Sequence, residues 1–321
     1  MERGYPRLLH FFLIHPRRKG VGVLRTMDAP NGLVPLERKM ERRCAHATRA
    51  LESSQTTNNM NPLLYTGRNI APKCRLEYDW TGWLSEHSAA PGSLDELVAS
   101  CAPLWKTDHL VLQASHFENG MIQLLFKSGP DVSPVVCASR AKGRLLHAFR
   151  AASVPATFSR KLSLRSLGAN TRTDVEQYIA RQAQRADLAD PRFASQLEEL
   201  AVINTSVSLA EPIETTRGRY WYNLHIVLVT QGRFRCTSDA DLRAIRDNCL
   251  EALAALKCCA TALSVMPDHL HAALRGNIDL SPAEIAVSIQ NLTSQKGGLG
   301  RVWQDEFYVG TFSEYSTEAM E

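Results

Sequence analysis

The chain has 321 residues, a net charge of +4 and 44% hydrophobic residues, values that are typical of a globular protein and exclude a fibrous or largely disordered one. Its longest strongly apolar stretch near the start, residues 8–14, is far shorter than the ~20 residues that a membrane-spanning helix needs. The eight cysteines form no CxxC pair, as expected for thiols in a reducing compartment. We therefore expect a cytoplasmic protein without a signal peptide or a membrane span.

Residues 1–65 combine an excess of basic side chains with no sustained hydrophobic period. The first 50 residues hold 11 Lys and Arg against 4 Asp and Glu, and a polar run leads up to Met60. Such a composition predicts a basic, disordered extension. The remainder of the chain is slightly acidic, so any surface for nucleic acid in it has to be local.

The next segment, residues 66–188, predicts alternating helices and strands. The expected elements are a helix over 93–105, two strands around a turn within 105–126, a helix over 133–149, a strand over 158–168 and a helix that contains 174–182. Residues 189–218, rich in Ala, Glu and Thr, are expected to form a linker.

The pattern is clearer in residues 219–321. The expected elements are a strand over 220–230, a helix over 238–256 capped by Ser238 or Asp239, strands over 258–265 and 269–276 around the turn Met266-Pro267-Asp268, a helix over 281–298 opened by Ser281 and Pro282, and a strand over 302–312 that leads into another helix.

These two segments share one order of elements, β-α-β-β-α-β-α. Residues 105–126 line up with 254–275 at an offset of 149, and Ser-Pro opens the following helix in both. The repeat predicts an α+β protein of two related domains, the first copy (residues 66–188) and the second copy (residues 219–321). The alternative is a pair of unrelated α+β segments.

His269 and His271 stand one residue apart on an expected strand. Side chains alternate along a strand, so both imidazoles project to one face and can bind the same metal ion. His-x-His also arises readily by chance, and the alternative is two half-buried strand histidines. The surroundings favour a site: a Met-Pro-Asp turn precedes the pair, and Trp303-Gln304 and an aromatic strand ending in YVGTF follow it.

With these motifs, residues 220–321 resemble the HUH single-strand DNA transposases with one catalytic tyrosine, the insertion-sequence 200/605 type and the REP-associated tyrosine transposases. The resemblance implies a ferredoxin-like domain in which His269, His271 and a Gln bind Mg²⁺ or Mn²⁺. It also implies a Tyr four residues before that Gln, on a following helix, that attacks DNA. The second copy lacks this Tyr and Gln, because the sequence stops at Glu321, two residues short of the place for the tyrosine.

The first copy supplies the missing pair. Tyr178 and Gln182 have the Tyr-x-x-x-Gln spacing of the family and would lie one above the other on a helix. Where the second copy has its two histidines, the alignment gives Gly120 and Ile122, which cannot bind a metal. In the resembled family, the tyrosine helix of one subunit docks on the histidine strand of the other.

The resemblance therefore implies a fused pseudo-dimer with one composite site, expected to behave as a monomer. Tyr178 would attack single-stranded DNA next to a hairpin and form a 5′-phosphotyrosine link, while His269, His271 and Gln182 hold the ion. Two other functions stay open: a domesticated DNA-hairpin binder without catalysis, and a metal-dependent hydrolase that shares only the His-x-His motif.

Candidate DNA contacts come from basic and aromatic residues of both copies. They are Arg160, Lys161, Arg165, Lys296 and Arg301, with Trp303 or Tyr308 stacking on a base. Individually, such residues are more often solvated charges and core aromatics. His225, on the first strand of the second copy, is expected to be a core or surface residue rather than a third ligand.

Overall fold

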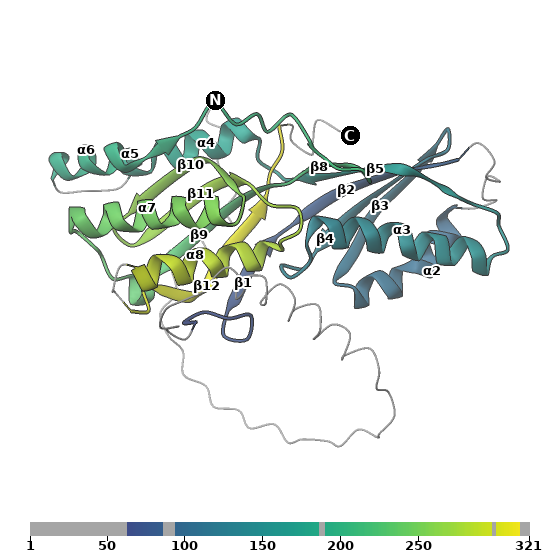
Figure 1. The fold of residues 1–321 in the computed structure, drawn as a ribbon, viewed down its shortest axis with the longest axis horizontal. Helices are drawn as coiled ribbons and strands as arrows, with labels where there is room; N and C mark the ends of the chain where they lie inside the picture. The colour runs from purple at the N-terminus through teal and green to yellow at the C-terminus, as the bar shows by residue number, and fades with distance from the viewer. Residues whose placement is uncertain (1–62, 86–93, 186–189, 297–299, 315–321) are drawn as a thin grey trace, which may run out of the picture. The chain divides into compact units, whose positions relative to one another are not determined.

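The computed structural model describes residues 63–85, 94–185, 190–296 and 300–314, which form two six-stranded sheets with helices packed on them (Figure 1). The N-terminal sheet has the order β3 (Leu110–Glu118), β4 (Met121–Ser128), β2 (Glu77–Leu84), β5 (Phe158–Leu167), β8 (Arg219–Trp221), β7 (Ile213–Glu214). The C-terminal sheet has the order β1 (Ala71–Arg75), β12 (Trp303–Thr311), β9 (Asn223–Thr230), β11 (His269–Arg275), β10 (Cys259–Met266), β6 (Val202–Ile203). The helices are α2 (Leu94–Thr107), α3 (Pro134–Ala151), α4 (Arg172–Ala180), α5 (Gln182–Arg185), α6 (Pro191–Leu200), α7 (Asp239–Ala255) and α8 (Pro282–Lys296), with a short 3-10 helix at Gln231–Arg233. The predicted α+β class is confirmed.

Both copies arrange four strands in the same way. The first strand of each, β2 or β9, lies between the third and the fourth, and the second strand lies beyond the third. A helix follows the first strand (α2 or α7) and another follows the third (α3 or α8). Each second strand also carries a one-residue register shift at the corresponding place, between Leu112 and Ala114 in β3 and between Ala260 and Ala262 in β10. The predicted order of elements is therefore present in full in the first copy, and its first six elements are present in the second, where the helix expected after β12 lies outside the described residues.

The expected strand over 220–230 is in fact two strands that belong to different sheets. β8 pairs in parallel with β5 of the first copy, and the chain then continues into β9. The chain also crosses between the sheets at the start of the first copy. There β1 pairs in parallel with β12 of the C-terminal sheet before the chain enters β2 of the N-terminal sheet. Equivalent hydrogen bonds hold the two crossings: Glu77 N donates to Thr311 Oγ1 at 2.9 Å, and Asn223 N donates to Ser166 Oγ at 3.1 Å. The two copies thus share backbone pairing.

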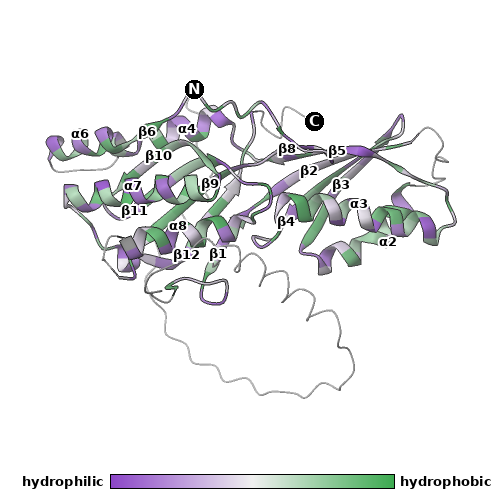
Figure 2. Ribbon diagram, in the orientation of Figure 1, coloured by the Kyte–Doolittle hydropathy of each residue, from purple (hydrophilic) through white to green (hydrophobic). Residues whose placement is uncertain are grey.

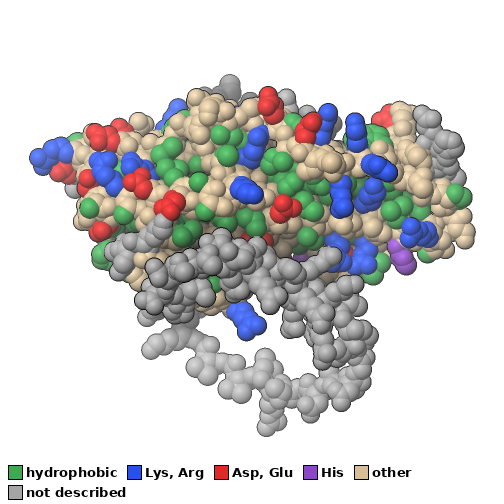
Figure 3. Space-filling view, viewed as in Figure 1, with side chains coloured by type: hydrophobic (Ala, Val, Ile, Leu, Met, Phe, Trp, Pro, Cys, Tyr) green, Lys and Arg blue, Asp and Glu red, His purple; other side chains and the backbone are tan. Residues whose placement is uncertain are grey.

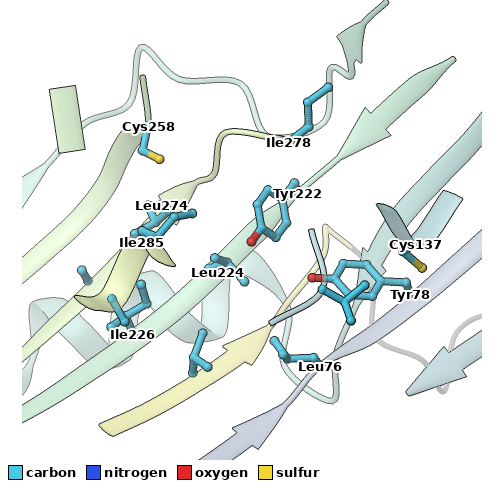
Figure 4. Packing of buried hydrophobic residues seen from close by; sticks show 14 of the residues in the cluster. Leu76, Tyr78, Cys137, Tyr222, Leu224, Ile226, Cys258, Leu274, Ile278 and Ile285 are labelled. Atoms are coloured by element: carbon cyan, nitrogen blue, oxygen red, sulfur yellow. The ribbon is translucent and has the colours of Figure 1, made fainter. Parts of the chain in front are cut away.

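The larger of two hydrophobic clusters extends through both sheets. Tyr78 of β2 and Tyr222, between β8 and β9, are fully buried with ring centroids 6.3 Å apart, among aliphatic residues of both copies (Figure 4). Burial raises the pKa of both phenols well above 10. Strands β9, β10 and β11 are largely hydrophobic, whereas α7 and α8 alternate hydrophobic and hydrophilic stretches, as expected for helices that cover one face of a sheet (Figure 2). None of the helices in the described residues is long and apolar enough to span a membrane.

The segments expected as extension and linker contribute to this core. Tyr65 is fully buried, and its Oη donates to Trp303 O at 2.8 Å. Asn291 Oδ1 accepts from the backbone nitrogens of Leu64 and Tyr65. The predicted disorder of residues 1–62 lies outside the described residues. Within 189–218 the chain forms α6, β6 and β7, and Leu197 of α6 is fully buried.

Gly168, which follows β5, packs against the backbone at the end of β12. We therefore expect a substitution at Gly168 to change the stability of the protein. A Cβ there would overlap Thr311 O and meet Phe312 Cα at 3.0 Å. Because both atoms are backbone, Gly168→Ala should lower the free energy of unfolding by about 2–3 kcal/mol. Urea unfolding measures this.

Gly143 provides the matched control. A Cβ there meets nothing within 4 Å, and the residue lies inside α3. Gly143→Ala should raise the free energy of unfolding by about 0.5–1 kcal/mol, because alanine loses less backbone entropy than glycine on forming a helix. Equal urea midpoints for the two variants would show that the contact at Gly168 is not tight.

Candidate active site

Helix α4 begins in the first copy but is anchored to the second. Thr171 and Asp174 form a capping box: Asp174 N donates to Thr171 Oγ1 at 3.2 Å and Thr171 N donates to Asp174 Oδ2 at 3.0 Å. Arg172 N donates to Ser313 O at 2.8 Å, just after β12, and Arg172 also forms an ion pair with Glu314. The cap therefore starts the helix beside the C-terminal sheet.

The apolar side of α4 packs on β10 and β11. Val175 and Ile179, one turn apart, are buried in a cluster with Ala262, Ala273 and Leu209. Ala262 and Ala273 lie opposite each other in the β10–β11 pair. Their small side chains let the helix approach the sheet, and the helix carries Tyr178 onto the strand that holds the two histidines.

The rings of the predicted site lie together. The ring centroid of Tyr178 is 5.4 Å from that of His271, and the centroids of His269 and His271 are 4.9 Å apart. The ring of His225 also lies 5.4 Å from that of His271 and 6.3 Å from that of Tyr178. The structure thus brings Tyr178 from one copy against the histidine strand of the other.

Both histidines have a partner at Nδ1. Asp268 Oδ1 lies 2.6 Å from His269 Nδ1, and Arg233 Nη1 donates to Asp268 Oδ2 at 3.2 Å. The hydrogen bond from His269, together with the charge of Arg233, lowers the pKa of Asp268, so this carboxylate is ionised and accepts the Nδ1 proton. His271 Nδ1 lies 3.1 Å from His225 Nε2. A His ligand that donates its Nδ1 proton to such a partner keeps Nε2 for a metal ion.

Burial keeps the inner imidazoles neutral. It lowers the pKa of His225 to about 4, and burial next to His269 and His225 lowers the pKa of His271 well below 6.5. A neutral imidazole has the lone pair that a metal ligand needs. The donor set at this place therefore fits a divalent ion bound by His269 and His271.

Gln182 is the first residue of the short helix α5 and does not lie on α4. The expected helix is interrupted at Arg181, and α5 begins at Gln182. Gln182 is 8% exposed, and its Nε2 donates to Tyr178 O at 3.2 Å, so its amide oxygen is the atom that could bind an ion. Among the described residues no group of three His, Cys, Asp or Glu side chains could hold a metal. A third protein ligand would have to be of another type, as Gln182 is.

The structure corrects the alignment of the two copies at the histidine positions. In β11, His271 pairs with Val227 of β9, and it lies two residues before Ala273, which is next to the register shift. In β4, the residue at the corresponding distance from the shift is Gln123, which pairs with Thr81 of β2. Met121, not Gly120, stands where the second copy has His269, and Gln123, not Ile122, stands where it has His271. The expected offset of 149 residues was wrong by one, because the strand pairing of both copies, which includes the shared register shift, superimposes at an offset of 148. The first copy still has no His-x-His pair.

Of the predicted DNA contacts, three side chains lie on the surface of the first copy. Arg160 and Lys161 are exposed, and the Arg165 guanidinium lies 4.4 Å from the ring centroid of Trp221. A cavity of about 600 Å³ between α3 and β5 has Lys142, Arg160 and Arg217 among its lining residues. Lys and Arg side chains gather on the face that carries α3, a helix with four Lys and Arg and no Asp or Glu (Figure 3).

The other predicted contacts are less available. Trp303 cannot stack on a base, because it is 1% exposed and its Nε1 donates to Thr293 Oγ1 at 2.7 Å inside the core. Tyr308 is half-buried, with its ring centroid 5.9 Å from that of His225. Arg301 covers the ring of Tyr65 at 5.1 Å and pairs with Asp305. The side chain of Lys296 lies outside the described residues.

The sequence analysis assigned no supporting role to three residues, His225, Asp268 and Arg233, although His225 is buried as one of the two expectations for it required. One signal was available, since His225 is a polar residue in the middle of an otherwise apolar strand. Its contact with His271 depends on the register of β9 against β11. In this register His225 pairs with Ala273, two residues from His271, so both histidines lie on the same face of the sheet. That register is set by long-range pairing and cannot be obtained from local spacing.

The low pKa of His225 predicts that acid destabilises the fold. Between pH 6.5 and 4 an unfolded chain protonates this histidine and the folded protein does not, so the free energy of unfolding falls as the pH falls through this window. From pH 7 to 4.5 the loss from this group is about 2–3 kcal/mol. Urea unfolding of the parent and of His225→Phe at both pH values measures the difference. An equal loss in the two proteins would contradict the prediction.

The second copy is similar to a known protein family. Residues 219–321 match the family model described as "Transposase IS200 like". No curated protein matches the chain. The matched segment contains β8 to β12 and both histidines, whereas Tyr178 and Gln182 lie before it. The C-terminal third of the chain is therefore similar to the IS200-like transposases, which indicates a DNA nuclease or transposase activity.

Proposed function

We propose that the protein cleaves and rejoins single-stranded DNA at one composite active site. Tyr178 of the first copy is the nucleophile, and His269 and His271 of the second copy are metal ligands. The observation that carries the proposal is the packing of the Tyr178 ring against His271, across the two copies, at 5.4 Å. A helix that merely filled space on the sheet would not need its tyrosine at the only His-x-His strand in the sequence.

The chemistry follows from the side chains present. His269, His271 and the amide oxygen of Gln182 would hold a divalent ion, Mg²⁺ or Mn²⁺, and its positive charge would make the scissile phosphate easier to attack. Tyr178 Oη loses its proton to solvent and attacks phosphorus. A bond forms between Oη and the 5′ phosphate, and the bond to the 3′ oxygen breaks, so that this oxygen leaves as a 3′ hydroxyl after taking up a proton. Attack by another 3′ hydroxyl reverses the step and joins two strands.

The two copies are proposed to be ferredoxin-like HUH domains that form a pseudo-dimer. The shared strand order and the two crossing strands, β1 and β8, support this relation. Because the partner is on the same chain, its effective concentration is in the mM range, and the protein is expected to function as a monomer.

The DNA is proposed to be single-stranded next to a hairpin. The basic surface over α3 and the cavity with Lys142, Arg160 and Arg217 offer charges for the phosphates. The Arg165–Trp221 pair provides a flat surface for an unstacked base. Most of this surface belongs to the first copy, which lacks the histidines, and Arg217 and Trp221 from the following residues complete it.

Covalent capture tests the proposal. A hairpin oligonucleotide with a single-stranded flank is labelled at its 3′ end and incubated with the protein and Mn²⁺. The expected result is a labelled protein band that survives denaturing electrophoresis, because the 5′ phosphate of the labelled fragment remains on Tyr178. Addition of EDTA should remove the band. DNA binding without any such band, with either metal, would sink the nuclease proposal.

That outcome would favour a second function, a hairpin-binding protein without catalysis. One observation points in its direction: the first copy has Met121 and Gln123 at the positions of the two histidines, so one of the two equivalent sites has no His pair. The retained contacts among Tyr178, His269 and His271 favour the catalytic reading.

A further inference from the structure

We propose that His225 is a positioning residue that fixes the ring-nitrogen protonation of His271, the more deeply buried metal ligand. The inference rests on the proposed function for its biological meaning, but it concerns a hydrogen bond within the chain. His225 Nε2 and His271 Nδ1 lie 3.1 Å apart, and both residues are nearly inaccessible, at 9% and 2% exposure.

Only one proton can lie between these two nitrogens. If His225 donated, His271 would carry its own proton on Nε2, and neither nitrogen of that ring would be free to bind an ion. If His271 donates from Nδ1, its Nε2 keeps a lone pair. His225 then accepts at Nε2 and carries its proton on Nδ1. The second arrangement makes His271 a ligand, and it gives His225 a defined role.

The neighbouring ligand is held in the same way by a different group. Asp268 accepts from Nδ1 of His269 at 2.6 Å, and Arg233 in turn donates to Asp268. Each histidine of the pair therefore has its own acceptor for the Nδ1 proton. The acceptor for His269 is the carboxylate of Asp268, and the acceptor for the more deeply buried His271 is the imidazole of His225. A carboxylate at the position of His225 would have to bury a charge, which is costly without a paired cation.

The first copy has a hydrogen bond at the corresponding place. Asp79 lies opposite Leu125 as His225 lies opposite Ala273, and Gln123 Nε2 donates to Asp79 Oδ2 at 3.0 Å. With the proposed protonation of His271, the third strand donates to the first strand at this point in both copies. Burial raises the pKa of Asp79, in line with the cost of a carboxylate here. The pair in the first copy offers a control that lacks the metal ligands.

The protonation of His271 can be measured without metal or DNA. Long-range ¹H–¹⁵N correlation spectra of the metal-free protein at pH 7.5 distinguish the two neutral forms of each imidazole, and the His271→Gln variant identifies the His271 signals. The expected result is His271 protonated at Nδ1 and His225 protonated at Nδ1. A spectrum with His271 protonated at Nε2 would overturn the inference, whatever the protein does to DNA.

Variants of His225 test the consequence for metal binding. In His225→Gln the amide oxygen can take the place of Nε2 as acceptor, whereas His225→Phe keeps a ring but no acceptor. Mn²⁺ affinity, measured by titration calorimetry or electron paramagnetic resonance, should fall about 10- to 100-fold in His225→Phe and much less in His225→Gln. Gln123→Leu, which breaks the matching bond in the first copy, should leave the affinity unchanged.

The outcomes separate the two proposals. A parent protein that binds no Mn²⁺ contradicts the proposed metal site, and the spectra still decide the protonation of His271. If His225→Phe binds Mn²⁺ as tightly as the parent protein does, the proposed role of His225 is wrong and the proposed function is unaffected. Thermal unfolding of each variant shows that a loss of affinity is not a loss of fold.

Discussion

Replacement of Tyr178 by Phe is expected to abolish the covalent link to single-stranded DNA, a decrease of at least about 10³-fold in adduct formation. The variant removes one oxygen and keeps the ring that packs against His271 and His225. The fold and the DNA-binding surface should therefore be preserved, because Lys142, Arg160 and Arg217 line the cavity between α3 and β5, whereas α4 packs on β10 and β11.

The assay is the 3′-labelled oligonucleotide with Mn²⁺, read on a denaturing gel beside a fluorescence anisotropy titration of the same DNA. Anisotropy should give the same affinity for the parent and for Tyr178→Phe. If Tyr178→Phe nicks the DNA as fast as the parent, the nucleophile is another group and the composite site is wrong.

Substitution of either histidine by alanine is expected to remove metal-dependent cleavage. His271→Ala and His269→Ala each delete an imidazole that would hold the ion, so the cleavage rate should fall by at least about 10²-fold and Mn²⁺ binding should weaken in parallel. Gln182→Ala should have a smaller effect, because a neutral amide oxygen is a weaker ligand than imidazole and water can replace it.

The first copy offers the control for this experiment. Met121→Ala removes the side chain that stands at the position of His269 in the equivalent strand. This variant should cleave at the parental rate. A rate that stays high in both histidine variants would mean that the metal, where cleavage needs one, is held elsewhere. Cleavage in the presence of EDTA would exclude a metal from the reaction.

The local part of the fold could be predicted from the sequence because local signals decide it. Ser238 caps α7 and Pro282 opens α8, as their positions before apolar helical patterns indicated. The candidate site could be proposed from two spacings, His-x-His and Tyr-x-x-x-Gln. Their meeting in space required the resemblance to a family, since no local rule brings residues of distant segments together.

The rest depended on pairing between strands far apart in the sequence. The strand expected over 220–230 is divided between two sheets at Tyr222, and nothing in its apolar pattern marks that point. The equivalence of Gln123, rather than Ile122, with His271 became visible only through the pairing of β3 with β4 and of β10 with β11. The role of His225 became visible only through the register of β9 and β11, because an isolated histidine in a strand has no signature of its own.

The crossing strands mean that the second copy is not a detachable module. A fragment cut at residue 219 would keep every element of the matched family segment, yet it would lose β1 from the outer edge of β12 and β6 from the outer edge of β10. Both margins of its sheet would then present unpaired backbone groups, a template for association with other chains. It would also lose α4, which covers Ala262 and Ala273. Both edges of the sheet of the transposase-like third, and part of one face, are thus covered by elements that precede residue 219: β1, β6 and α4.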